Sequence, residues 1–261
     1  MRRLYTASIV IGLLAAVILQ SCIYYPRNYY VYQPHNVPML RDSGEVALDV
    51  GAACNFESNH YWPFIVAEHE SYGFNIDAAY SPIKNFGIMG GYNFYNDHNN
   101  NSITAHNGEL AVGYYRPFGT YWVFDVYGGD RFTFQKHLFD NGNQGSTHVQ
   151  MHNIFVQPSI GFSYAPVDLV YGVRIGYAYY NSIDHNITHE KEAEAINWLV
   201  KNRGHLMGEY SITLRAGYKD IKAQLQLSHG FKLGQTYENM PQLNSFTVSL
   251  GLHFCFGRTY P

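Results

Sequence analysis

Eight charged residues stand where their side chains could pair with one another or bind a charged ligand. Each lies in a segment in which large apolar residues alternate with small or polar ones, and each occupies the polar row. They are Asp49, Asp77, Glu109, Asp125, Arg174, Glu209, Arg215 and Lys222. Carboxylates and cations that face one enclosed space would form an ion-pair network or a polarised passage for a ligand. We predict the network, because an unpaired charge in a narrow interior is costly.

Serine, histidine and acidic residues near the ends of these segments are the other candidates for chemistry. They would supply the parts of a hydrolase, in which a base activates a nucleophile or a water molecule. The candidate groups are Asp97–His98, Asp184–His185, Ser182 with His185, and Ser228 with His229. Adjacent residues of a strand point to opposite faces, which argues against the last group. No surrounding motif supports the others, so the sequence assigns no catalytic residue.

His185 and His189 are four positions apart, a spacing at which two imidazoles on one helical face can share a metal ion. The segment 189–203 predicts a helix, with Thr188 as its cap and Gly204 as its C-terminal stop. His185 then falls before the helix, which spoils the geometry. We therefore predict neither a metal site nor a cofactor.

The composition indicates a membrane or secreted protein. Charged residues make up 14% of the 261 residues, against about 25% in an average soluble domain, and 24 residues are tyrosine. Beyond the first 20 positions no run approaches the roughly 18 apolar residues that a spanning helix needs, so a membrane would be crossed by strands. The net charge is −3 without a basic patch, which excludes nucleic-acid binding.

Ten blocks with a period of two follow one another from residue 44 to residue 257. In the first block Val46, Leu48 and Val50 share one face and Asp49 lies on the other. Short turns follow the even-numbered blocks and longer loops follow the odd-numbered ones. Transmembrane barrels have short periplasmic turns and long outer loops in this way.

The pattern predicts an all-β fold, a closed antiparallel up-and-down transmembrane barrel of about ten strands with one short helix in an outer loop. Closure requires the first strand to pair with the tenth, since an open edge in hydrocarbon would leave backbone groups unpaired. The start of the first strand and the end of the tenth strand then both lie on the periplasmic side. Cys54 and Cys255 should lie at opposite ends of that strand pair and should not meet.

The last block carries a recognisable pattern, Ser249-x-Gly251-x-x-Phe254-x-Phe256. It resembles the C-terminal insertion signal of small Gram-negative outer-membrane β-barrel proteins. The resemblance covers about residues 44–257 and implies the barrel-assembly machinery as a folding partner. Such barrels commonly stop on an aromatic residue, whereas this chain adds a tail, residues 258–261.

The N-terminal residues resemble a lipoprotein signal peptide, residues 1–21, that ends at a lipobox. Arg2 and Arg3 precede an apolar segment, and Leu19-Gln20-Ser21-Cys22 would direct cleavage before Cys22 and its acylation. The alternative is an ordinary signal peptide with a chance cysteine. Residues 22–43 have no clear period and predict a lipid-anchored linker, or a segment tucked against the barrel mouth. The sequence leaves open whether residues 23–43 plug the barrel.

These patterns predict a lipid-anchored protein of the cell outer membrane, with its N-terminus in the periplasm and a structural or surface-binding role. Its partners would be outer-membrane lipid, the assembly machinery and a surface ligand that the sequence does not identify. A narrow conduit for small solutes and an outer-rim hydrolase, either a protease or a lipid-modifying enzyme, are the alternatives. A soluble barrel with its apolar rows turned inward is the remaining one.

Overall fold

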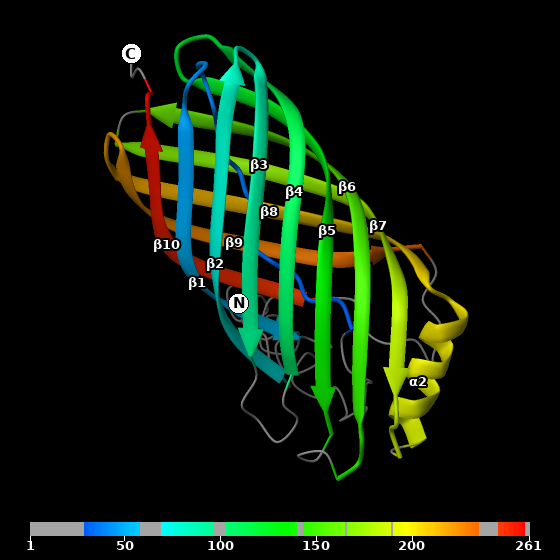
Figure 1. Ribbon diagram of the computed structural model, residues 1–261. Helices are drawn as coiled ribbons and strands as arrows, with labels where there is room; N and C mark the ends of the chain where they lie inside the picture. The colour runs from blue at the N-terminus through cyan, green and yellow to red at the C-terminus, as the bar shows by residue number, and fades with distance from the viewer. Residues whose placement is uncertain are drawn as a thin grey trace, which may run out of the picture.

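The described residues form a closed barrel of ten antiparallel strands (Figure 1). The structure is a computed structural model that describes residues 29–57, 69–96, 103–139, 143–164, 166–188, 190–234 and 245–258. The strands are β1 (Val46–Glu57), β2 (His69–Ile83), β3 (Phe86–Asn96), β4 (Ile103–Phe118), β5 (Trp122–Leu138), β6 (Ser146–Tyr164), β7 (Val167–His185), β8 (Gly204–Tyr218), β9 (Ile221–Leu233) and β10 (Ser245–Phe256). Each strand pairs with its neighbours in sequence, and β1 pairs with β10. The predicted fold and its closure are confirmed.

The apolar rows face outward and the charged rows face the lumen, as predicted. On β2, Phe74, Ile76 and Tyr80 are exposed, whereas Asn75 and Asp77 are buried. The same alternation runs along the other strands. An exposed apolar exterior around a polar interior is the arrangement that a barrel needs in lipid, and it excludes the soluble barrel.

Short turns and long loops lie at opposite ends of the barrel (Figure 1). The turns between β2 and β3 and between β8 and β9 lie at the same end as the start of β1 and the end of β10, which we call the periplasmic end. The helix α2 (Glu190–Lys201) lies at the other, outer end. It ends earlier than predicted. Gly204 is not its stop but the first residue of β8, where it pairs with Tyr179 of β7.

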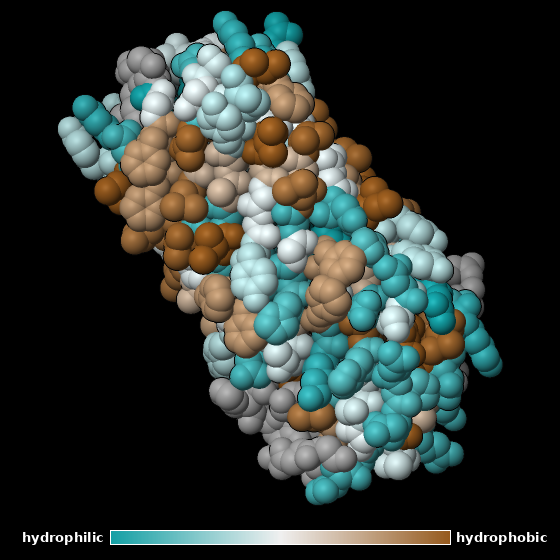
Figure 2. Space-filling model, in the orientation of Figure 1, coloured by the Kyte–Doolittle hydropathy of each residue, from teal (hydrophilic) through white to brown (hydrophobic). Residues whose placement is uncertain are grey.

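The outer surface has an apolar part and a polar part. Figure 2 shows apolar side chains gathered toward the periplasmic end at the upper left and polar ones toward the outer end at the lower right. At the outer end His148 of β6 faces outward between Lys136 of β5 and Asp184 of β7. The outer parts of these strands therefore extend beyond the apolar band. Among the described residues no helix is long and apolar enough to cross a membrane.

Residues 29–41 run through the inside of the barrel, and we call them the plug segment (blue coil in Figure 1). Every residue from Tyr29 to Arg41 is buried. The Tyr29 ring lies 4.7 Å from that of His137 near the outer end of β5. Arg41 donates to the carbonyl of Thr120 in the β4–β5 turn, 2.9 Å away. The chain thus passes from the outer end to the periplasmic end before it enters β1.

The segment predicted as a linker or a mouth contact therefore lies inside the lumen over residues 29–41. The side of the membrane at which this segment begins also differs from the prediction. The strands begin and end at the periplasmic end, as expected, but Tyr29 lies at the outer end. The physical reason is that the polar lumen offers this segment hydrogen-bond partners along its whole length.

The β1–β10 pair keeps the two cysteines of the barrel apart. Cys54 is opposite Val248, and Cys255 is opposite Ala47. The two thiols lie at opposite ends of the pair, as predicted. In the C-terminal pattern, Ser249 faces the lumen, Gly251 is opposite Gly51, and Phe254 and Phe256 lie on the outward row.

Candidate functional site

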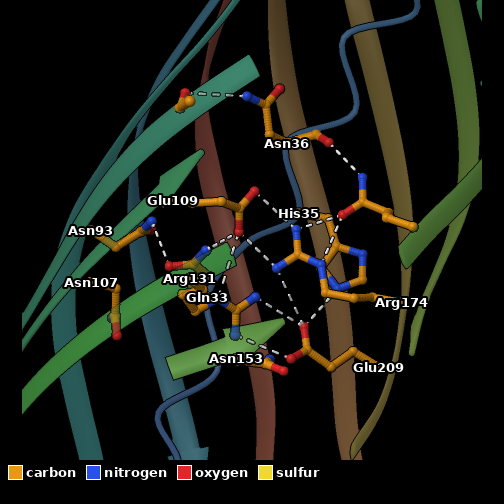
Figure 3. Close-up of polar contacts among 12 residues, drawn as sticks. Gln33, His35, Asn36, Asn93, Asn107, Glu109, Arg131, Asn153, Arg174 and Glu209 are labelled. Atoms are coloured by element: carbon orange, nitrogen blue, oxygen red, sulfur yellow. Dashed lines mark hydrogen bonds and ion pairs between the residues drawn. The ribbon is translucent and has the colours of Figure 1, made fainter. Parts of the chain in front are cut away.

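The middle of the lumen holds four charged side chains, Glu109 of β4, Arg131 of β5, Arg174 of β7 and Glu209 of β8, which we call the central cluster (Figure 3). Arg174 donates from Nη1 and Nη2 to the two carboxylate oxygens of Glu109, at 2.8 and 3.1 Å. Arg131 donates to both oxygens of Glu209, at 3.1 and 3.3 Å. Side-chain exposure is at most 2%. Bidentate pairs of this kind are the strong form of the arginine–carboxylate contact.

These two pairs cross the lumen. In the strand register Glu109 is opposite Arg131 and Arg174 is opposite Glu209, so each residue has an oppositely charged neighbour on the adjacent strand. The bidentate contacts instead join β4 to β7 and β5 to β8. Weaker approaches, 3.6 Å for Arg131–Glu109 and 3.9 Å for Arg174–Glu209, complete a ring of alternating charge. The cluster therefore ties opposite walls of the barrel together.

Three side chains of the plug segment contact the central cluster. The Tyr30 hydroxyl donates to Glu209 Oε1 at 2.7 Å, and Gln33 Nε2 donates to Glu109 Oε2 at 2.6 Å. His35 Nε2 lies 2.9 Å from Glu209 Oε2. These contacts use lone pairs of the carboxylate oxygens that the arginines do not occupy. The plug segment is thus bound by the same carboxylates that hold the cross-lumen pairs.

Barrel side chains also bind the backbone of the plug segment, whose buried peptide groups need partners. Gln226 accepts from the N–H of His35 at 2.6 Å and donates to its carbonyl at 2.9 Å. The carbonyls of the next residues accept from other strands. The donors are Gln157 to Asn36, Arg215 to Val37, and Arg258 to Met39, at 2.7, 3.0 and 2.6 Å. Side chains from several strands thus satisfy this backbone.

Two lumen-facing glycines make room for large side chains of the plug segment. A Cβ added at Gly230 would lie 1.5 Å from the Tyr32 ring, and one added at Gly161 would lie 2.3 Å from the end of Met39. Real Cβ contacts are never this short, so a side chain at either position would displace the plug. The barrel wall is therefore shaped to fit this segment.

A second group of charges lies nearer the periplasmic end. Lys222 binds Asp168 at 2.8 Å, and Arg215 lies 3.4 Å from Asp49. His253 Nδ1 also lies 2.7 Å from Asp49. Next to this group, Arg258, two residues after the end of β10, pairs with Glu45, the residue before β1. The predicted tail therefore begins with a residue that joins the start of β1 to the end of β10.

The eight predicted charges do not form one network. Glu109, Arg174 and Glu209 belong to the central cluster, and Asp49, Arg215 and Lys222 belong to the periplasmic group. Asp77 and Asp125 stand apart. Asp77 accepts from Asn75 at 2.9 Å, and Asp125 accepts from Ser159. Among the described residues, these two carboxylates bind polar neighbours on the barrel wall and form no ion pair.

Several charged or polar residues of these groups were not predicted from the sequence, although the sequence pattern could have identified two of them. Arg131 continues the inward row of β5, which also holds Asp125, Tyr127 and Thr133, so the alternation along this strand could have identified it. Asp168 lies on the same inward row of β7 as Arg174, and the alternation along that strand could have identified it. The further missed members are Gln33, His35, Glu45, His253 and Arg258.

The hydrolase candidates are only partly within the described residues. Asp97 and His98 lie outside them, as does His189 of the histidine pair considered for a metal ion. Ser182 donates to Asp184 at 3.2 Å. Ser228 is buried in the lumen, whereas His229 packs beside Tyr210 on the outward row, so these two point apart as predicted. Within the described part of the chain, no three His, Cys, Asp or Glu side chains are grouped so as to hold a metal ion.

An apolar layer covers the outer end of the plug segment. Tyr29, Tyr30 and Tyr32 pack in one buried cluster with Ile196 and Leu199 of α2 and with residues of β6, β7 and β8. The Tyr29 hydroxyl also donates to Glu192 of the helix at 3.3 Å. The long loop that contains α2 therefore contributes to closing the outer mouth above the central cluster.

The fold is similar to those of solved outer-membrane proteins. The outer membrane protease OmpT from Escherichia coli matches with a TM-score of 0.45 and 8% identity, over 81% of this chain and 97% of that chain. An outer membrane channel from Pseudomonas putida F1 gives 0.44 and 10%, over 87% and 100%. Ail, the attachment invasion locus protein of Yersinia pestis, gives 0.27 and 10%, over 82% and 99%. At these identities the likeness concerns the fold alone. No family model and no curated protein sequence matches the chain.

Proposed function

We propose that this protein is a closed outer-membrane barrel with a structural or surface-binding role, in which the outer loops carry the recognition and the lumen is filled. The observation that carries the proposal is the plug segment bound across the central cluster. Barrels of this size have interiors just wide enough to be packed by side chains, and open aqueous channels belong to barrels of about 16 strands. The thirteen buried residues of the plug segment occupy the space that a water-filled pore through this ten-stranded barrel would need.

The proposal includes export and anchoring by the N-terminal residues. Residues 1–21 would be removed as a lipoprotein signal peptide, and Cys22, which lies outside the described residues, would carry the acyl groups. Residues 44–257 would be inserted by the barrel-assembly machinery through the pattern of Ser249, Gly251, Phe254 and Phe256. Support comes from the positive end and apolar segment of the signal and from the position of that pattern on the closing strand.

The experiment is conductance in planar bilayers. Refolded protein containing residues 22–261 should show no steady open level, and the same protein with residues 29–41 replaced by a flexible Gly/Ser linker should conduct small ions. Heat-modifiable gel mobility controls for barrel formation in both proteins. Steady openings of the unchanged protein would contradict the proposal and favour a narrow conduit.

The conduit has one observation in its favour. The plug segment is held by side chains and takes no part in the strand ladder, so it could move without breaking the barrel. Conductance that appears only when a surface ligand is added would identify a gated conduit.

A further inference from the structure

The direction of the plug segment determines on which side of the membrane the chain before it lies. Tyr29 packs at the outer end, beside His137 and α2, and Arg41 lies at the periplasmic end, beside the β4–β5 turn. The intermediate contacts follow in order. Tyr30, Gln33 and His35 lie at the central cluster, and Met39 is bound by Arg258 at the end of the closing strand. The chain therefore travels inward from the cell-surface side.

Chain length prevents a return to the periplasm. Seven residue steps separate Cys22 from Tyr29, and a fully extended chain spans at most about 3.6 Å per residue, or roughly 25 Å. The apolar band of such a barrel is itself about 25 Å tall, and Tyr29 lies beyond it at the outer end. A return path through the lumen is also blocked, because the plug segment and the two charged groups fill it.

We propose that the chain before Tyr29 leaves the barrel at the outer mouth, so that Cys22 lies at the cell surface and its acyl chains enter the outer leaflet. This inference rests on the acylation included in the proposed function, but the side on which the N-terminus lies can be tested without it. The same span of about 25 Å that cannot reach the periplasm can reach from the mouth down to the outer leaflet. The anchor would therefore be on the side opposite to the one that the sequence suggested.

This topology has a consequence for assembly. An acylated N-terminus cannot be threaded through a finished barrel whose lumen is packed, so the barrel must close around the plug segment. The closing contacts agree with this order. Arg258, two residues after the end of β10, binds both Glu45 before β1 and the carbonyl of Met39 in the plug segment. Closure of the β1–β10 pair and capture of the plug are thus made by one side chain.

The test uses the full chain in intact cells, with a short epitope inserted between Tyr25 and Pro26. Two matched insertions serve as controls, one in the periplasmic turn between Lys84 and Asn85 and one after Gly234 in the long loop that follows β9. Antibody binding is measured before and after the outer membrane is permeabilised. Incorporation of labelled palmitate, with Cys22→Ser as the control, is measured on the same proteins.

We expect the N-terminal epitope to bind antibody in intact cells as strongly as the epitope after Gly234, while the epitope at Lys84 binds only after permeabilisation. Palmitate should label the protein and be lost in Cys22→Ser. An N-terminal epitope that behaves like the one at Lys84 would overturn the proposed topology. A surface epitope without palmitate label would instead refute the acylation, and with it the outer-leaflet anchor, while the folded barrel is verified by heat-modifiable mobility.

Discussion

Glu109 shows at the scale of one residue how a charge is kept inside this barrel. Its side chain is 2% exposed, accepts from both guanidinium donors of Arg174, and also accepts from Gln33 of the plug segment. Glu109→Gln would leave Arg174 buried without its main counter-charge. Breaking a buried pair in this way costs about 3–5 kcal/mol, which should appear as a lower urea midpoint in refolding followed by heat-modifiable mobility.

The matched control for this change is Glu190→Gln, because Glu190 is exposed in the first turn of α2. A surface change of this kind usually stays within about 0.5 kcal/mol. Equal midpoints for the two variants would mean that the ion pairs across the lumen contribute little and that the ladder of strands alone sets the stability.

At the scale of elements, the plug segment is held by fit as well as by hydrogen bonds. Gly230 of β9 leaves the space that the Tyr32 ring occupies. We expect Gly230→Ala to push this ring out of place and to destabilise the barrel by about 1–3 kcal/mol, the usual cost of overpacking. In the background of Tyr32→Ala the same change should cost much less, and a double-mutant cycle on urea midpoints measures the difference. If the cost of the double substitution equals the sum of the two single costs, the Tyr32 ring does not press on β9.

The strands could be predicted from the sequence because their signal is local. Alternation with a period of two sets the face of each side chain, so the outward Val46 and Val50 and the inward Asp49 were predicted correctly. The alternation of short and long connections then determined the topology. Arg131 was not predicted, although it lies on the same inward row of β5 as Asp125.

The plug segment could not be predicted in the same way. Tyr29 to Arg41 has no period, since its partners lie on many strands and not on a neighbour in sequence. His35, for example, contacts Glu209, Ser211 and Gln226, which are more than 170 residues away along the chain. The division of the charges into two groups depends on the same long-range geometry. The alternation along a strand places a side chain in the lumen. It does not give the position of that side chain along the barrel axis or its partner on the opposite wall.

At the scale of the whole molecule, the barrel is longer than its apolar band, and this makes the membrane position testable on one strand. Val156 and His148 both face outward on β6. Val156 is 52% exposed in an apolar row with Ile154 and Ile160, whereas His148 lies between charged residues of the neighbouring strands. We expect Val156→Lys to destabilise the folded barrel in liposomes by about 2–4 kcal/mol and His148→Lys by about 0–1 kcal/mol, since the cost of a lipid-facing lysine depends on its depth. Urea unfolding in liposomes measures both. Similar costs at the two positions would mean that the membrane does not lie over the apolar part of the surface.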